Sequence, residues 1–408
     1  MSDDPIVLGT YDESLARLLF HVPAPRIETT ALDDAHGRYL GEHVIAARSQ
    51  PPAAVSAMDG YAISGDELAP GACYTVVGIS YPGAPYLGRI SKYQAVRVTT
   101  GAWMPEGASR VLVDEIVADC QGELCLLREP GAKTHVRAAG SDFRLGTTLV
   151  MAGTRLTAPA LMAAAAGHAA TVRVFRRPVV RIIATGDELA RGLATIEPDQ
   201  TADSVSIGVS ALATDWGGIV RDAVRCGDAA EALQCMLRSA VQTSDTVVVI
   251  GGASGSERDL ARGAASSLGA ETIFQGVAIK PGRPVWAARC DTHARSCLII
   301  GLPGNPLAAF ITARLFLAPV LAKMACGTAA GAVNWRSARL LTPLEEGSGK
   351  EAFLAATTGP DGLRLLPSQE SSSQGHLADL RALIRRAPSA PAGADVAYLD
   401  VEARLQPY

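Results

Sequence analysis

Four carboxylate side chains in the middle of the chain have the chemistry of a site for a divalent cation. They are Asp187, Glu188, Asp203 and Asp259. Carboxylates beside a phosphate-bearing ligand repel it unless a hard cation lies between them, and Mg²⁺ prefers such oxygen ligands. These residues therefore predict a magnesium site next to a phosphate group. Any one aspartate can instead cap a helix, and for Asp203 or Asp259 alone a cap is the favoured interpretation.

Glycine-bearing loops follow three apolar, strand-like runs in the same part of the chain. The loops span residues 185–188, 251–256 and 301–306. In a doubly wound sheet such loops share the edge at the carboxyl ends of the strands, where free backbone N–H groups can bind phosphate. Glycine can also do no more than permit a tight turn, but three loops together favour a ligand site. The candidate substrate-binding residues of these loops are Gly251, Gly252, Ser254, Pro303, Asn305 and Pro306.

The segment 279–284, Ile-Lys-Pro-Gly-Arg-Pro, carries two cations in a chain that two prolines stiffen. Lys280 and Arg283 lie three residues apart, and a rigid pair of this kind suits a compact oxyanion. A solvated surface turn explains the same residues equally well. In the first third of the chain, Asp59 and Thr100 lie in the turn-like segments SAMDGY and VTTGA. There an ordinary turn is the simpler interpretation.

The composition excludes several classes of protein. A chain of 408 residues, 48% hydrophobic with 40 Gly and 24 Pro, predicts a compact globular protein of two to four domains. The formal net charge of −4 and the lack of a basic block in the sequence count against nucleic-acid binding. The acidic start has no apolar segment, and the Ala-rich stretch 158–167 is too short to span a membrane. We therefore expect a cytoplasmic protein with no membrane partner.

The glycine loops also lack the motifs of two common nucleotide-binding families. None of them matches G-x-G-x-x-G or G-x-x-x-x-G-K-[ST]. Eight cysteines are scattered without a C-x-x-C pair or a histidine at zinc-ligand spacing, so we expect buried free thiols. The seven histidines are equally dispersed and give no local support for a histidine-based metal site.

The pattern of apolar and helical stretches along the sequence predicts a multidomain protein with α/β and β parts. Residues 178–327 alternate apolar strands with helical stretches, which indicates a central doubly wound α/β domain with a parallel sheet. Short β-prone runs predict a small β unit at 51–136 and a C-terminal, barrel-like β domain at 328–408. Residues 1–50 and 137–177 predict one N-terminal helical domain that is discontinuous in sequence.

Helical periodicity gives the expected helices. They lie at 11–20, near 205–217, near 228–241 and near 257–268, with a further Ala-rich helix near 158–167. For the first of these helices, Asp12 or Ser14 is a possible N-terminal cap.

Taken together, seven segments resemble the molybdopterin molybdenumtransferase family, which includes the E-domain of gephyrin. The segments are PPAAVSAMDGYAI, RVTTGAWMPEGASRVLVDE, VRAAGSDFRLGTTLVMAGTRLT, RRPVVRIIATGDEL, GGASGSERD, GVAIKPGRPV and GLPGNPLAA. They occur in the order of the family and run through about residues 50–310. The N-terminal arm and the C-terminal β domain match it more weakly.

The resemblance implies a molybdenum cofactor enzyme that inserts molybdate into adenylylated molybdopterin and releases AMP with the help of Mg²⁺. It also implies an elongated homodimer whose active cleft lies between the α/β domain of one subunit and the β unit of the other. An upstream adenylyltransferase and molybdoenzyme apoproteins are the expected protein partners. By position, the family's catalytic residues are Asp59, Asp142, Glu188 and Asp259, and its further substrate-binding residues are Thr100, Asp203, Ser204, Lys280, Arg283 and Lys350.

The sequence departs from the family pattern at several of these positions. Val205 replaces the Asn of an Asp-Ser-Asn loop, Ser256 the Gly of a glycine loop, and Arg283 the second lysine of a paired-lysine motif. In the C-terminal domain Lys350 stands where an Arg is expected, and His376 where a Ser is expected. Arg and Lys do not bind oxyanions equivalently. These departures leave open the alternative of a catalytically weakened paralogue that binds molybdopterin as a carrier or scaffold.

Overall fold

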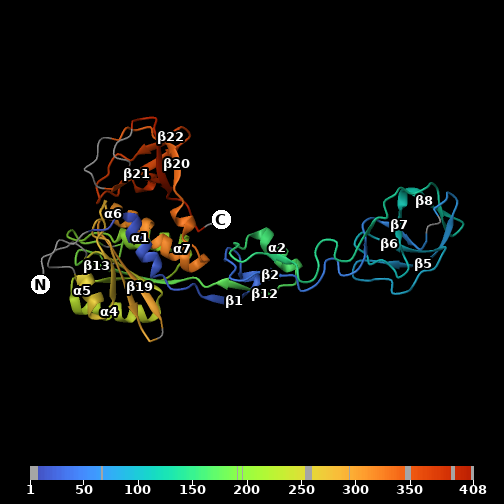
Figure 1. The fold of residues 1–408 in the computed structure, drawn as a ribbon, viewed down its shortest axis with the longest axis horizontal. Coiled ribbons are helices and arrows are strands. Elements are labelled where there is room, and N and C mark those ends of the chain that lie inside the picture. The colour runs from blue at the N-terminus through green and yellow to red at the C-terminus, as the bar shows by residue number, and fades with distance from the viewer. Residues whose placement is uncertain are drawn as a thin grey trace. The chain divides into compact units, whose positions relative to one another are not determined.

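The computed structural model describes residues 8–65, 68–190, 192–194, 196–252, 260–293, 295–344, 351–386 and 391–405. The chain forms two compact units, one of residues 29–172 and one of residues 1–28 with 173–408. Figure 1 shows the elements of both. Three sequence-predicted site residues, Ser254, Asp259 and Lys350, lie outside the described residues.

The unit of residues 29–172 contains a six-stranded sheet in the range where the sequence predicts a small β unit. In spatial order its strands are β7 (Arg110–Val113), β4 (Gly60–Ile63), β6 (Gln94–Val98), β5 (Cys73–Ser80), β9 (Glu123–Leu126) and β8 (Val117–Cys120). Neighbouring strands are antiparallel except β5 and β6, which are parallel. Adjacent residues of β4, Ala62 and Ile63, are buried in two different hydrophobic clusters, so both faces of the sheet are covered.

The cysteines of this sheet correct the expectation of free thiols. Cys73 on β5 and Cys125 on β9 are register partners and form a disulfide. Two more cysteines, Cys120 and Cys235, are exposed. Buried free thiols are therefore confirmed only for Cys226, Cys290, Cys297 and Cys326.

Short paired segments make up the rest of this unit. They are β2 (Val44–Ile45) with β11 (Thr148–Val150), β3 (Val55–Ser56) with β10 (Val136–Arg137), and helix α2 (Ala158–Ala166). A further two-stranded sheet joins β1 (Ile27–Ala31) and β12 (Thr171–Phe175), and the division between the two units falls within both of these strands. The first of these pairings brings the segment before residue 50 against the segment after residue 137.

The first helix, however, does not belong to that discontinuous domain. Helix α1 (Tyr11–Phe20) lies in the other unit, where Tyr11, Leu15 and Leu18 are buried in the core of the α/β sheet. Its predicted bounds are confirmed, but its predicted cap is wrong. Thr10 accepts a hydrogen bond from the backbone of Glu13 while the Glu13 side chain accepts one from the backbone of Thr10, and this capping box begins the helix.

The second unit contains a six-stranded α/β sheet. In spatial order its strands are β14 (Ile219–Cys226), β13 (Val179–Thr185), β15 (Thr246–Ile250), β19 (Ser296–Leu302), β18 (Trp286–Asp291) and β16 (Glu271–Gln275). The first four strands are parallel, whereas β18 runs antiparallel to both of its neighbours. The expectation of a wholly parallel sheet is therefore wrong at β18, because the short connection from β18 to β19 is a hairpin rather than a crossover helix.

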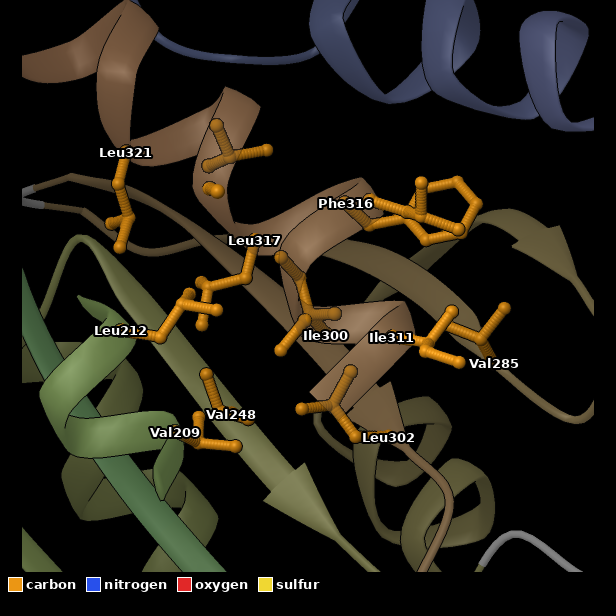
Figure 2. Close-up of a cluster of buried hydrophobic side chains, with 14 of the residues drawn as sticks. Val209, Leu212, Val248, Val285, Ile300, Leu302, Ile311, Phe316, Leu317 and Leu321 are labelled. Carbon is orange, nitrogen blue, oxygen red and sulfur yellow. The ribbon is translucent and has the colours of Figure 1, made fainter. Parts of the chain in front are cut away.

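Helices cover both faces of this sheet. They are α3 (Ser204–Asp215), α4 (Ala230–Thr243), α5 (Leu260–Ser267), α6 (Pro306–Thr312) and α7 (Ala318–Cys326). On β15, Val248 packs against the face of α3, α6 and α7, while Val249 packs against the face of α4 and α5. The alternation is that of strands buried on both sides. Figure 2 shows the first of these clusters, with Val209, Leu212, Val248, Val285, Ile300, Leu302, Ile311, Phe316, Leu317 and Leu321 labelled.

One helical run in this unit is apolar enough to cross a membrane by length and composition. It spans Pro306–Cys326, through α6, a π-helical turn at Ala313–Leu317 and α7. Its most apolar window has a mean hydropathy of 1.6, but 89% of that window is buried inside the protein. The run is therefore a core helix of the α/β domain, and no other such helix occurs in the part of the chain that the structure describes.

A second sheet completes this unit. Its strands are β17 (Ile279–Lys280), β21 (Glu351–Gly359), β23 (Ala382–Arg385), β24 (Asp395–Asp400) and β20 (Arg336–Arg339), with β22 (Gly362–Leu365) paired to β21. A bridge between Leu340 and Leu363 also joins the end of β20 to β22. Strand β17 lies in the range where the sequence predicts the α/β domain, but it pairs with β21 of the C-terminal sheet. A strand pairing therefore joins the α/β part and the C-terminal part of this unit.

Gly301 on β19 tests the packing between strands. It lies opposite Trp286, and a Cβ atom at Gly301 would be 1.9 Å from the indole Nε1. We expect Gly301→Ala to lower the free energy of unfolding by about 1–3 kcal/mol, because the buried indole must move. The matched control is Gly263→Ala in α5, where nothing lies within 4 Å and alanine should stabilise the helix by about 0.5–1 kcal/mol. Equal effects of both changes in urea unfolding would contradict this account.

Candidate active site

The carboxyl ends of three parallel strands meet at one edge of the α/β sheet, as the sequence predicts. Strands β13, β15 and β19 are neighbours. The Thr185 hydroxyl donates to the Ile250 carbonyl at 3.2 Å, and the Gly251 N–H donates to the Leu302 carbonyl at 3.1 Å. Gly251 has φ +85°, and a Cβ there would be 2.8 Å from the carbonyl oxygen of Thr185. Glycine is therefore required where the strand ends come together.

Two exposed carboxylates, Asp187 and Glu188, follow β13 at this edge. Oδ1 of Asp187 accepts a hydrogen bond from the backbone N–H of Asp228 at 3.0 Å. The carboxylate of Glu188 lies so close to Gly186 that a Cβ at that glycine would be 2.6 Å from both of its oxygens. The carboxylate of Glu188 is therefore exposed to solvent and lies directly beside Gly186.

Asp203 has a different environment. Its side chain is buried, with Oδ1 accepting from the Ser206 N–H at 3.0 Å and Oδ2 lying 3.2 Å from Nε of Arg225. It caps α3 and forms an ion pair, so both of its oxygens are engaged. Among the described residues, no group of three or more His, Cys, Asp or Glu side chains is placed to hold a metal ion. Asp259 lies outside the described residues.

A large cavity lies between the α/β edge and the C-terminal sheet. Its volume is about 970 Å³, and it brings together four predicted substrate-binding residues: Lys280, Arg283, Pro303 and Asn305. Both cationic residues are exposed, as a ligand-binding role requires. Pro306 begins helix α6 next to this wall.

The opposite wall of the cavity comes from the C-terminal part of the chain. It includes an apolar group, Pro343, Leu344, Leu354, Leu365 and Pro367, and a polar group, Ser368, Gln369, Glu370, Ser371 and Arg386. The loop 368–374 is hydrogen-bonded to the α/β edge. Asn305 Nδ2 donates to Ser371 Oγ at 3.0 Å, and Ser204 Oγ donates to Gln374 Oε1 at 2.7 Å. Two predicted substrate-binding residues, Ser204 and Asn305, therefore also hold this loop in place.

In the unit of residues 29–172, the structure brings Asp59 and Thr100 together. The backbone N–H and the hydroxyl of Thr100 donate to Oδ1 of Asp59 at 2.7 and 2.9 Å. These two hydrogen bonds lower the pKa of Asp59 below its ordinary value. The next residue, Gly60, has φ +153°, and a Cβ there would be 2.1 Å from the Leu112 carbonyl oxygen, so the turn that carries Asp59 requires glycine.

Asp142, the remaining predicted residue of this unit, lies in the turn after β10. It is exposed, and its backbone N–H donates to the Gln50 carbonyl at 3.0 Å. The turn is thus anchored to the segment that precedes β3.

Sequence reasoning missed Arg386 and residues 368–371 of the loop 368–374 as parts of the cavity. The loop is a polar, Ser-rich stretch that is typical of solvent-exposed linkers. Arg386 is one of two adjacent arginines after an apolar run, which alone indicates only a strand end. The signal that identifies Arg386 is strand register, which the sequence does not give.

Comparison with known proteins places these features in a family. Residues 9–167 match the model of the MoeA N-terminal region (domain I and II), and residues 181–323 match that of a probable molybdopterin binding domain. Proteins named molybdopterin molybdenumtransferase are similar over most of the chain. The Haemophilus influenzae protein is 29% identical over 77% of each chain. The Nostoc protein is 32% identical over 71% of this chain and 67% of its own.

A third relative, molybdopterin molybdenumtransferase 2 of Mycobacterium tuberculosis, is 30% identical over 80% of this chain and 82% of its own. Two solved structures of the molybdopterin biosynthesis MoeA protein from Pyrococcus horikoshii have a similar fold. One has a TM-score of 0.84 and 24% identity and covers 98% of this chain and 100% of its own. The other has a TM-score of 0.72 and 23% identity and covers 96% and 99%.

Removal of the Thr100 hydroxyl tests whether this group stabilises the ionised form of Asp59. We expect Thr100→Val to raise the pKa of Asp59, because the carboxylate loses one of the two donors that stabilise its ionised form. The value should stay below the ordinary one, since the backbone donor remains. The measurement is a carboxyl-carbon NMR titration, with Thr99→Val as the control. An unchanged Asp59 titration in Thr100→Val would show that the hydroxyl does not stabilise the carboxylate.

Proposed function

Because the chain belongs to the molybdopterin molybdenumtransferase family, we propose that it acts in molybdenum cofactor biosynthesis by inserting molybdate into adenylylated molybdopterin, with release of AMP. The observation that carries this proposal is the cavity of about 970 Å³ that Lys280 and Arg283 line beside the glycine loops of the α/β edge. It has room for a ligand of that size, and its cations suit a dianion. Among the residues that the structure describes, no feature favours a carrier or scaffold over an enzyme.

In this proposal the α/β edge binds the phosphate-bearing part of the substrate. Gly251 and Gly252 both have positive φ and offer close backbone approach at the strand ends. Water attacks the phosphorus atom on the molybdopterin side of the phosphoanhydride, the bond from that phosphorus to the bridging oxygen breaks, and AMP leaves with the bridging oxygen. The cationic pair holds molybdate until two pterin thiolates replace two of its oxygens, which take up four protons from the solvent and leave as two water molecules.

A magnesium ion would neutralise the charge of the phosphates at this edge. Glu188 fits the role of a ligand, because it is exposed beside Gly186, and Asp187 is its neighbour. Asp259 completes the proposed set. Asp203 fits less well, since ligation would require it to give up Ser206 or Arg225. Its clearer role is to fix the start of α3, next to Ser204.

The proposal further includes a homodimer with a shared active cleft. Asp59, Thr100 and Asp142 are exposed on a unit other than the one that carries the cavity. We propose that they complete the cleft of the partner subunit. The proposed compartment is the cytoplasm. An adenylyltransferase supplies the substrate in this proposal, and molybdoenzyme apoproteins accept the product.

Release of AMP from adenylylated molybdopterin is the experiment that tests the function. We expect Glu188→Gln to reduce the rate by about tenfold or more, because a neutral amide keeps the shape of the side chain but binds Mg²⁺ poorly. The matched control is Glu197→Gln, another exposed glutamate in the same connection, which should leave the rate within about twofold. No AMP release by the wild-type chain at saturating Mg²⁺ would refute the proposed function.

Mixing two inactive variants tests the shared cleft. An Asp59→Ala chain and a Glu188→Ala chain each lack one part of every site in their own dimers. If the cleft is formed by two subunits, a mixed dimer keeps one intact site, and an equal mixture should regain about a quarter of wild-type activity. Sedimentation at micromolar concentration should show a dimer. A monomer, or a mixture without activity, would place the whole site within one chain.

A further inference from the structure

Three neighbouring strands of the C-terminal sheet place an arginine across from Lys280. Lys280 on β17 and Ala352 on β21 are register partners. The backbone N–H of Arg386, which directly follows β23, donates to the carbonyl of Ala352 at 2.8 Å. Residues opposite one another on adjacent strands project from the same face of a sheet. The side chains of Lys280, Ala352 and Arg386 therefore share one face, and all three residues line the cavity.

The two adjacent arginines at the end of β23 have different surroundings. Arg385 forms ion pairs with Asp12 at 2.7 Å and Glu351 at 2.6 Å, and its guanidinium lies 5.5 Å from the ring centroid of Tyr11. Successive side chains of a strand point to opposite faces. The side chain of Arg385 thus contacts α1, whereas the side chain of Arg386 lines the cavity on the opposite face.

The residue between the two cations is small. Adjacent strands lie about 4.8 Å apart, so the backbones at Lys280 and Arg386 are separated by about 10 Å, with Ala352 on the strand between them. Both side chains are long and can converge over the Ala352 methyl group. The space above it suits a compact tetrahedral dianion that both cations contact.

The surrounding charges favour the same ligand. Lys280, Arg283 and Arg386 are the cations among the lining residues that the structure describes, and Glu370 is the carboxylate among them. The excess of positive charge favours an anion over a neutral ligand. A guanidinium adds two parallel N–H donors, which match a pair of oxygens of a tetrahedral oxyanion.

We infer that Arg386 binds molybdate from the side opposite Lys280, so that the oxyanion lies between two cations above Ala352. The inference rests on the proposed function, which supplies molybdate as the substrate. It adds an oxyanion-binding residue that lies outside the segments of the family resemblance, and it assigns the affinity for molybdate to the C-terminal sheet as well as to the α/β domain.

Molybdate binding to the full chain, measured by titration calorimetry, tests this assignment. We expect Arg386→Ala to weaken binding by about ten- to a hundredfold, because a charge-assisted contact is lost. Arg386→Lys should recover most of the affinity. The matched control is Arg364→Ala on β22, an exposed arginine of the same sheet that is not among the cavity-lining residues, and it should change affinity by less than about twofold.

A second variant tests the gap between the cations without removing charge. Ala352→Val fills part of the space above the methyl group, and we expect it to weaken molybdate binding while thermal unfolding stays cooperative. If Ala352→Val does not fold, Arg386→Ala still decides, because Arg386 is partly exposed and its removal leaves no cavity in the core.

The outcomes separate this inference from the proposed function. Arg386→Ala with wild-type affinity, beside a weakened Lys280→Ala, overturns the role of Arg386 and leaves the function intact. Parallel titrations with inorganic phosphate identify the ligand, and a loss confined to phosphate would assign Arg386 to a phosphate group instead of molybdate. A wild-type chain that neither binds molybdate nor releases AMP would overturn the proposed function itself.

Discussion

The contact of helix α1 with both sheets of its unit is the interaction on which the cavity depends. Tyr11 is buried, with its ring 5.7 Å from that of Phe316 in the α/β domain and 5.2 Å from that of Phe353 in the C-terminal sheet. Burial raises the pKa of the Tyr11 hydroxyl, which keeps it neutral in this position. Because one aromatic ring contacts both the α/β domain and the C-terminal sheet, packing fixes their separation.

Backbone contacts extend this constraint to the cationic segment. The carbonyl of Gly9 accepts from the N–H of Ala278 at 2.9 Å, two residues before Lys280. The Tyr11 N–H donates to Glu351 at 3.4 Å, and Glu351 is the register partner of Ile279. The short pairing of β17 with β21 is thus held by residues 9–11, which are 340 residues away from β21 in sequence. The positions of the cations follow from three separate parts of the chain.

These long-range contacts explain what the sequence could and could not predict. The bounds of α1 and the convergence of the loops after β13, β15 and β19 follow from local periodicity and from the geometry of parallel strands. The partner of Asp203 could not be predicted, because Arg225 is twenty-two residues away on a different element. The burial of α1 depends on Phe316 and Phe353, and the direction of Arg386 depends on the register of three strands. These contacts and this register belong to the tertiary structure, which the periodicity of the sequence does not reveal.

The buried helical run Pro306–Cys326 has a consequence for how the chain reaches its native state. Its apolar surface is covered by residues from both ends of the chain, including Leu15 and Leu18 before it and Leu383 and Leu399 after it. A ribosome releases these covering segments at different times, and the last of them emerges only when β24 is complete. Until then, the apolar surface of this run is covered only in part. The N-terminal helix is the covering segment that is already available when this run is synthesised, whereas the C-terminal strands are not.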